Sequence, residues 1–168
     1  MFVFKPLKYQ KPTEFVNHVR MIFYIMVGTP LCIFLLLYFN FRQNNLHDNS
    51  QNLSVFWLAV LPLICFFFAG YAYYLYGKKL KEARTKTRMR ERLNIVFQGT
   101  MEKFILLESV TFVVLCAYFV NQHILYAGLY MVMLILFAMS NPTIFTVING
   151  LRLSREQSAA MQQNHTIQ

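Results

Sequence analysis

The stretch KKLKEARTKTRMRERLNIVFQGTMEK, residues 78–103, decides how this chain is organised. It carries nine Lys and Arg residues against three Glu, and it lies between two strongly apolar runs, 55–76 and 104–120. Two further apolar runs cover residues 21–39 and 124–139. Runs of about 17–25 apolar residues are typical of helices that cross a bilayer. The chain therefore predicts an all-α, polytopic membrane protein with four transmembrane helices, arranged as two antiparallel hairpins.

The positive charge alternates between the segments that separate these runs. All but one of the sixteen Lys and Arg residues lie in the N-terminal arm, in 78–103 or after the fourth run. The exception is Arg42 in the first loop, and the turn 121–123 holds none. This positive-inside pattern predicts that both termini and the 78–103 segment face the cytoplasm. We expect a multi-pass protein of a bacterial inner (plasma) membrane, whose first run stays as an anchor because no cleavage site follows it.

The composition supports a lipid environment. The hydrophobic fraction is 57%, more than a water-surrounded core of 168 residues can hide. The net charge of +9 is explained by orientation and by attraction to anionic headgroups. Nucleic acid is not expected as a partner, because no aromatic residues interleave the basic run to stack on bases. The residues predicted to contact anionic lipid are Lys78, Lys79, Lys81, Arg84, Arg88 and Arg92.

Motifs of catalysis, metal binding and cofactor binding are not found in the sequence. Cys32, Cys65 and Cys116 fall one in each of three apolar runs and form no CxxC pair. Hydrolase, metalloprotease, P-loop and dinucleotide-binding signatures are missing as well. We therefore expect no enzyme activity, no cofactor and no metal. A lipid-modifying enzyme would need His, Asp or Arg clustered at one interface.

The basic stretch itself predicts helical structure. It contains no Gly or Pro over 78–92, so the second helix is expected to continue into it before the chain turns back, with Glu82 and Lys86 paired at i,i+4. From Leu93 the apolar residues recur at helical spacing, which predicts an amphipathic start of the third helix. Residues 143–153 predict a short surface helix. One transmembrane domain is expected over 1–153, and a polar cytoplasmic tail over 154–168.

Glu108 is the only charged side chain within the four apolar runs. It lies four residues, roughly 6 Å of helix rise, beyond Phe104. Ionisable residues inside membranes are costly and mark functional sites by default. One hypothesis is that Glu108, with Ser109 and Thr111, binds or relays an ion. The other is that Glu108 is a structural carboxyl, protonated and bonded to a neighbouring helix or reaching the inner interface.

Two hairpins, the basic loop 78–103 and one intramembrane carboxylate loosely resemble the double-hairpin c-type rotor subunits of rotary ATPases, over residues 15–140. The first helices of those subunits are glycine-rich, whereas this one has only Gly28. Their carboxylate lies on the second helix of a hairpin, whereas Glu108 is on the first, so a rotor function is not carried over. The chain also looks similar to small uncharacterised four-span proteins of bacterial inner membranes, which implies neither activity nor site residues.

These patterns favour a non-catalytic membrane protein, serving as a small subunit, scaffold or stabilising partner of an inner-membrane assembly. Lipids and either another membrane subunit or a second copy of the chain are the expected partners, because small residues let helices approach closely. These small residues are Ala69, Gly70, Ala72, Ala127, Gly128 and Ala138. The alternative is an ion- or proton-coupled transport component that uses Glu108.

Overall fold

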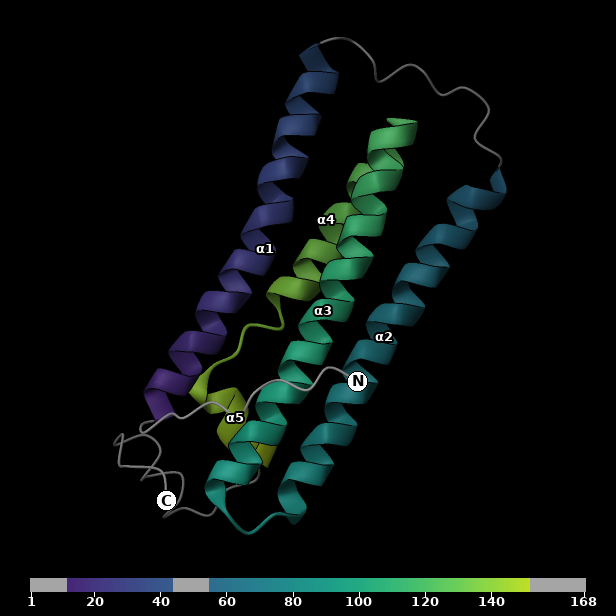
Figure 1. Ribbon diagram of the computed structural model, residues 1–168. Coiled ribbons are helices and arrows are strands. Elements are labelled where there is room, and N and C mark those ends of the chain that lie inside the picture. The colour runs from purple at the N-terminus through teal and green to yellow at the C-terminus, as the bar shows by residue number, and fades with distance from the viewer. Residues whose placement is uncertain (1–11, 44–54, 152–168) are drawn as a thin grey trace. The chain divides into compact units, whose positions relative to one another are not determined.

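The computed structural model describes residues 12–43 and 55–151, and this part of the chain contains helices but no strand (Figure 1). The helices are α1 (Pro12–Gln43), α2 (Val55–Thr85), α3 (Met89–Asn121), α4 (Ile124–Ala138) and α5 (Ile144–Leu151). The all-α prediction is confirmed. The predicted polar tail and most of the N-terminal arm and first loop lie outside the described residues.

The contacts divide the chain into two compact units. The first combines the chain up to Tyr24 with Ala72–Phe104 and the chain from Asn141. The second combines Ile25–Tyr71 with Ile105–Ser140. Helices α1, α2 and α3 each contribute to both units, whereas α4 belongs to the second and α5 to the first. The single domain expected over 1–153 stays a prediction.

Three helices are long and apolar enough to cross a membrane: Glu14–Phe41, Ala59–Thr85 and Met89–Asn121. The fourth apolar helix, α4, has 15 residues. At 1.5 Å per residue it is about 22 Å long, shorter than the ~30 Å hydrocarbon layer. The transmembrane character of the chain is thus supported by three helices, and the four-span hairpin arrangement stays a prediction.

The amphipathic start of α3 is as the sequence predicts. The apolar residues that recur at helical spacing are buried in the first unit: Leu93, Val96, Phe97, Met101 and Phe104. The Phe97 ring lies 6.1 Å from that of Phe15, and the Phe104 ring lies 5.4 Å from that of Phe23. Because both contacts advance in the same direction along the two helices, α1 and α3 run parallel within this unit.

Helix α2 continues into the basic stretch, as predicted, and ends at Thr85, whereas α3 begins at Met89, four residues before the predicted Leu93. The position of the break at 86–88 was not predicted. Side chains bond to carbonyl oxygens on both sides of the end of α2: Thr85 Oγ1 donates to Glu82 O at 2.8 Å, and Arg92 Nε donates to Lys86 O, just beyond the helix, at 2.6 Å. Threonine hydroxyls compete with helical bonds in this way, so the helix ends without Gly or Pro.

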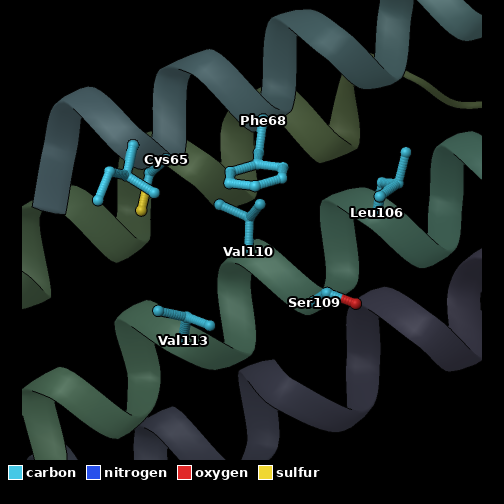
Figure 2. Close-up of a pocket in the computed structure, with 7 residues that line it drawn as sticks. Cys65, Phe68, Leu106, Ser109, Val110 and Val113 are labelled. Carbon is cyan, nitrogen blue, oxygen red and sulfur yellow. The ribbon is translucent and has the colours of Figure 1, made fainter.

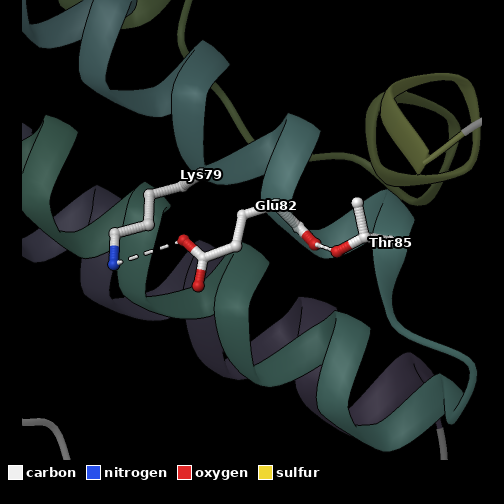
Figure 3. Close-up of polar contacts among 3 residues, drawn as sticks. All are labelled: Lys79, Glu82 and Thr85. Carbon is white, nitrogen blue, oxygen red and sulfur yellow. Dashed lines mark hydrogen bonds and ion pairs between the residues drawn. The ribbon is translucent and has the colours of Figure 1, made fainter.

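The ion pair in this region also differs from the prediction. Glu82 does not pair with Lys86 but with Lys79, one turn earlier, with an N–O distance of 4.0 Å (Figure 3). The Glu82 side chain is 54% exposed. Exposed pairs of this kind are worth about 0–1 kcal/mol, so the contact orients the lysine more than it stabilises the fold.

The second unit has an aromatic core supplied by all of its helices. The rings of Phe34 in α1 and Tyr130 in α4 stack with centroids 4.4 Å apart and an interplanar angle of 17°. Tyr118 in α3 lies 5.5 Å from Phe34, and Cys65 in α2 belongs to the same cluster. Offset stacking of this type adds to ordinary packing, so this cluster holds α4 against α1 and α3 within the unit.

Helix α5 is docked on α2 in the first unit. Arg84 donates from Nε and Nη2 to the carbonyl oxygen of Gly150 at 2.9 and 2.7 Å. Val147 and Leu151 are buried, and a Cβ at Gly150 would lie 3.2 Å from the methyl groups of Leu80. The short helix predicted over 143–153 is therefore present, and a cation at its C-terminal end complements its dipole.

Candidate functional site

Glu108 lies half-buried on α3 in the second unit. Its carboxylate makes no hydrogen bond or ion pair among the described residues. The structural alternative, a carboxyl bonded to a neighbouring helix, therefore has no partner in this part of the chain. An unpaired carboxylate in an apolar helix needs water, a proton or a cation.

The two hydroxyls expected beside Glu108 are both bonded to the backbone of α3. Thr111 Oγ1 donates to the carbonyl oxygen of Glu108, and Ser109 Oγ donates to that of Ile105, each at 2.8 Å. Thr111 is 1% exposed, whereas Ser109 is exposed. The three residues share one helix but not one environment. No group of three or more His, Cys, Asp or Glu side chains in the described ranges could hold a metal ion, and ion binding at Glu108 stays a prediction.

The six residues predicted to contact anionic lipid fall into two sets. Arg84 binds Gly150, Arg92 binds the carbonyl of Lys86, and Lys79 pairs with Glu82. The remaining three, Lys78, Lys81 and Arg88, are exposed and make no polar contact within the described residues. The first set holds the ends of α2, α3 and α5 in place, and the second set remains available to a ligand.

An apolar groove lies between α2 and α3 in the second unit (Figure 2). Its volume is about 210 Å³, and the Phe68 ring of α2 points toward Val110 of α3 across it. The other lining residues are Ile64, Cys65, Leu106, Ser109 and Val113. The Ser109 hydroxyl is the main polar group of the lining, and it is already bonded to Ile105. The groove can therefore pack against an apolar group, such as an acyl chain, but offers it no free hydrogen-bonding group.

Sequence reasoning missed a buried cation in the first unit. Lys103 is 6% exposed, and its Nζ lies 4.5 Å from the ring centroid of Tyr76, 5.3 Å from that of Tyr73 and 5.5 Å from that of Phe104. All three distances are within cation–π range. These four residues form what we call the lysine cage. Two helices build it, since Tyr73 and Tyr76 lie one turn apart on α2.

A sequence signal for the cage did exist. Lys103 occupies a position in the buried stripe of α3, seven residues after Val96 and four before Leu107. A lysine in such a stripe must either reach the surface or find a partner. Grouping Lys103 with the exposed basic residues before it concealed this position.

Gly99 explains how closely α2 and α3 approach beside the cage. A Cβ at this position would lie 2.8 Å from Lys79 Cβ and 3.6 Å from Cδ2 of the Tyr76 ring. The first distance is below any ordinary contact, so only glycine fits. The absence of a side chain here lets Tyr76 lie against α3, within reach of Lys103.

Comparison with known proteins gives no relative from which a site could be transferred: no family model, no curated protein and no solved structure matches the chain.

Proposed function

We propose that this chain is a non-catalytic integral membrane protein that acts as a small subunit or stabilising partner of a bacterial inner-membrane assembly. The observation that carries the proposal is the exposure of large apolar side chains along the span-length helices. Leu36 of α1 is 72% exposed, Phe67 of α2 is 71% exposed and Val120 of α3 is 73% exposed. Soluble monomers rarely expose apolar surface on this scale, whereas lipid or another membrane helix covers it without cost.

The Arg84–Gly150 contact supports a fourth crossing and a shared side for α5 and the 86–88 break. Helix α3 runs from that break to the turn at Gln122. By Gly150 the chain has returned to the start of this path, because Gly150 accepts hydrogen bonds from Arg84 of α2. The return uses α4, about 22 Å long, and the five residues 139–143, which extend at up to ~3.3 Å each. This length suffices to recross the hydrocarbon layer. Together with the positive-inside pattern, it supports the proposal that both termini are cytoplasmic.

Small residues on exposed faces support association with a partner helix. A Cβ built at Gly70 or at Gly128 would meet nothing within 4 Å. Ala69, Ala72 and Ala127 are buried within the chain instead. Small exposed residues on membrane helices let a second helix approach closely, so the faces that carry Gly70 and Gly128 are the preferred partner surfaces.

Two measurements test the proposal. Carbonate extraction of membranes should leave the full-length chain in the pellet, and native mass spectrometry in mild detergent should show a dimer or a second membrane protein. Replacing Gly70 or Gly128 by Leu should abolish that association without releasing the chain from the membrane. A monomer with no co-purifying protein would count heavily against the subunit role.

A second candidate function rests on the unpartnered carboxylate of Glu108 and is ion- or proton-coupled transport. Glu108→Gln should abolish pH-dependent flux in proteoliposomes. Glu102→Gln is the matched control, because Glu102 lies on the same helix at similar burial but before the apolar run. Unchanged flux in the Glu108 variant, or no flux with the parent chain, would remove this candidate.

A further inference from the structure

The lysine cage holds a buried cation without a buried anion. Transfer of an ammonium group out of water is costly even after relaxation. Each ring face attracts the cation, so Tyr73, Tyr76 and Phe104 offset part of this cost. Ring faces neutralise no charge, however, and no ion pair joins Lys103 to a carboxylate in the described part of the chain.

The first unit as a whole is short of anions. Its described residues include ten Lys and Arg against four Glu. Of these Glu residues, Glu14 and Glu91 are exposed, and Glu82 is paired with Lys79. The fourth, Glu102, is half-buried and forms no ion pair with Lys103. Among the described residues, no carboxylate therefore pairs with the cation of the cage.

Arg20 on α1 shows the same deficit. Its Nε is buried and has no hydrogen-bond partner among the described residues. Arg20 lies one turn before Phe23, whose ring contacts that of Phe104 in the cage. A buried guanidinium N–H left without an acceptor is costly. Arg20 Nε on α1 and Lys103 on α3 are thus two buried cationic groups of the first unit, and the contact between Phe23 and Phe104 joins their helices. Neither group has an ion-pair partner among the described residues.

We propose that the lysine cage and Arg20 bind the phosphate of an anionic phospholipid headgroup. Phosphate oxygens accept charge-assisted hydrogen bonds from both ammonium and guanidinium groups. Tyr73 is 39% exposed and forms the accessible edge of the cage. Tyrosines are enriched at the depth of the headgroups, where ring and hydroxyl each meet a suitable environment.

The position of Lys103 agrees with a lipid as the source of the phosphate. Lys103 is the last charged residue before the apolar run that begins at Phe104. In the predicted topology this boundary lies at the cytoplasmic headgroup layer, where anionic lipids concentrate. The inference rests on the membrane location proposed above but not on the subunit role.

Native mass spectrometry of the full-length chain in mild detergent tests the site. The chain is titrated with phosphatidylglycerol or with phosphatidylcholine, and bound lipid is counted. The parent chain should bind phosphatidylglycerol preferentially, and Lys103→Gln should weaken that binding about tenfold, the effect of one charge-assisted hydrogen bond. Lys103→Arg should retain it, since arginine keeps both the charge and the ring contacts.

Lys86→Gln is the matched control, because it removes the same charge from an exposed lysine that is not among the six predicted lipid contacts and whose side chain has no partner in the described ranges. This variant should change phosphatidylglycerol binding less than twofold. Equal losses in the Lys86 and Lys103 variants would show diffuse attraction and overturn the site. Equal binding of the two lipids by the parent chain would also overturn it.

Two further experiments test whether the site prefers a lipid to free phosphate and whether Arg20 belongs to it. Inorganic phosphate at millimolar concentration should not displace the lipid; displacement would show a site for the free anion and overturn the lipid assignment. Arg20→Gln should weaken phosphatidylglycerol binding as Lys103→Gln does, so the test survives if the latter fails to fold. Because only lipid binding is measured, the outcome is independent of whether a protein partner exists.

Discussion

The hydroxyl of Tyr130 is the clearest unsatisfied group at the residue scale. Tyr130 is fully buried, and its Oη has no hydrogen-bond partner among the described residues. Tyr130→Phe keeps the stacked ring and removes the hydroxyl whose hydrogen bonds are unsatisfied. We expect the variant to be more stable by about 1 kcal/mol, seen as a midpoint of thermal unfolding in detergent raised by about 2–4 °C.

The reverse substitution on the opposite ring is the control. Phe34→Tyr adds a hydroxyl to the same stack, where no acceptor is waiting, and should lower the midpoint. If Tyr130→Phe lowered it instead, the hydroxyl would have a partner and the assignment would be wrong.

The turn after α3 stores strain at a single residue. Gln122 has φ 53°, the left-handed region, and its Oε1 is buried without a partner in the described residues. Gln122→Gly removes both the backbone strain and the buried side-chain oxygen. It should stabilise the chain by about 1 kcal/mol, measured by thermal or chemical unfolding in detergent.

The neighbouring residue provides the comparison for this change. Asn121→Gly removes the Nδ2 bond to Ala117 O, 2.9 Å long, from a residue with ordinary helical φ. This variant should be less stable than the parent. A fall in stability for Gln122→Gly would show that the side chain, not the backbone, is what matters at the turn.

Lys103 shows where residue-level prediction from sequence stops. Its burial follows from the helical register of α3, which the sequence reveals. Whether the Lys103 ammonium group reaches the surface or stays buried depends on Tyr73 and Tyr76, which belong to α2. Tertiary contacts of this kind have no local signature, so a lysine that shares its segment with eight other basic residues was assigned to the surface.

At the scale of elements, the close approach of α2 and α3 depends on Gly99. Gly99→Ala would place a methyl group 2.8 Å from Lys79 Cβ and force the helices apart. We expect a loss of about 1–3 kcal/mol in stability, measured by thermal unfolding in detergent, although alanine favours helix by about 1 kcal/mol.

Gly77→Ala is the matched control, since it makes the same change in α2 where nothing lies within 4 Å. It should be neutral or slightly stabilising. If the two substitutions changed the stability equally, helix propensity rather than packing at Gly99 would explain the change.

Periodicity predicted the elements better than it predicted their ends. The stripe from Leu93 to Phe104 placed the buried face of α3 correctly, because 3.6-residue spacing is a property of one helix. A turn between the two helices was predicted, but its position at 86–88 was not, because no Gly or Pro marks it. Thr85 and Arg92 bond to backbone carbonyls there, and the bond from Arg92 to Lys86 spans the break.

At the scale of the whole molecule, the side of the membrane on which α5 lies shows whether the chain crosses the bilayer four times or three. Single cysteines at Arg88, Ile124 and Asn149 in a background lacking native cysteines report on the 86–88 break, the start of α4 and α5. In intact cells a membrane-impermeant maleimide should label only Ile124→Cys. All three sites are expected to react after permeabilisation.

Labelling of Asn149→Cys together with Ile124→Cys in intact cells would mean that α4 does not cross. The charge pattern alone cannot decide this, because α4 has no charged residue and is shorter than an average span. Sequence therefore indicates a membrane protein more firmly than it indicates the number of its crossings.

The bond between Arg84 and Gly150 joins residues 66 positions apart. On the ribosome, at about 5–20 residues per second, the partner of Arg84 is synthesised roughly 3–13 s after Arg84 itself. During that interval α5 does not yet cover Leu80, and the C-terminal end of α2 is open to proteases and chaperones. A nascent chain halted before α5 should be degraded faster than the full-length protein, which makes α5 a checkpoint for quality control.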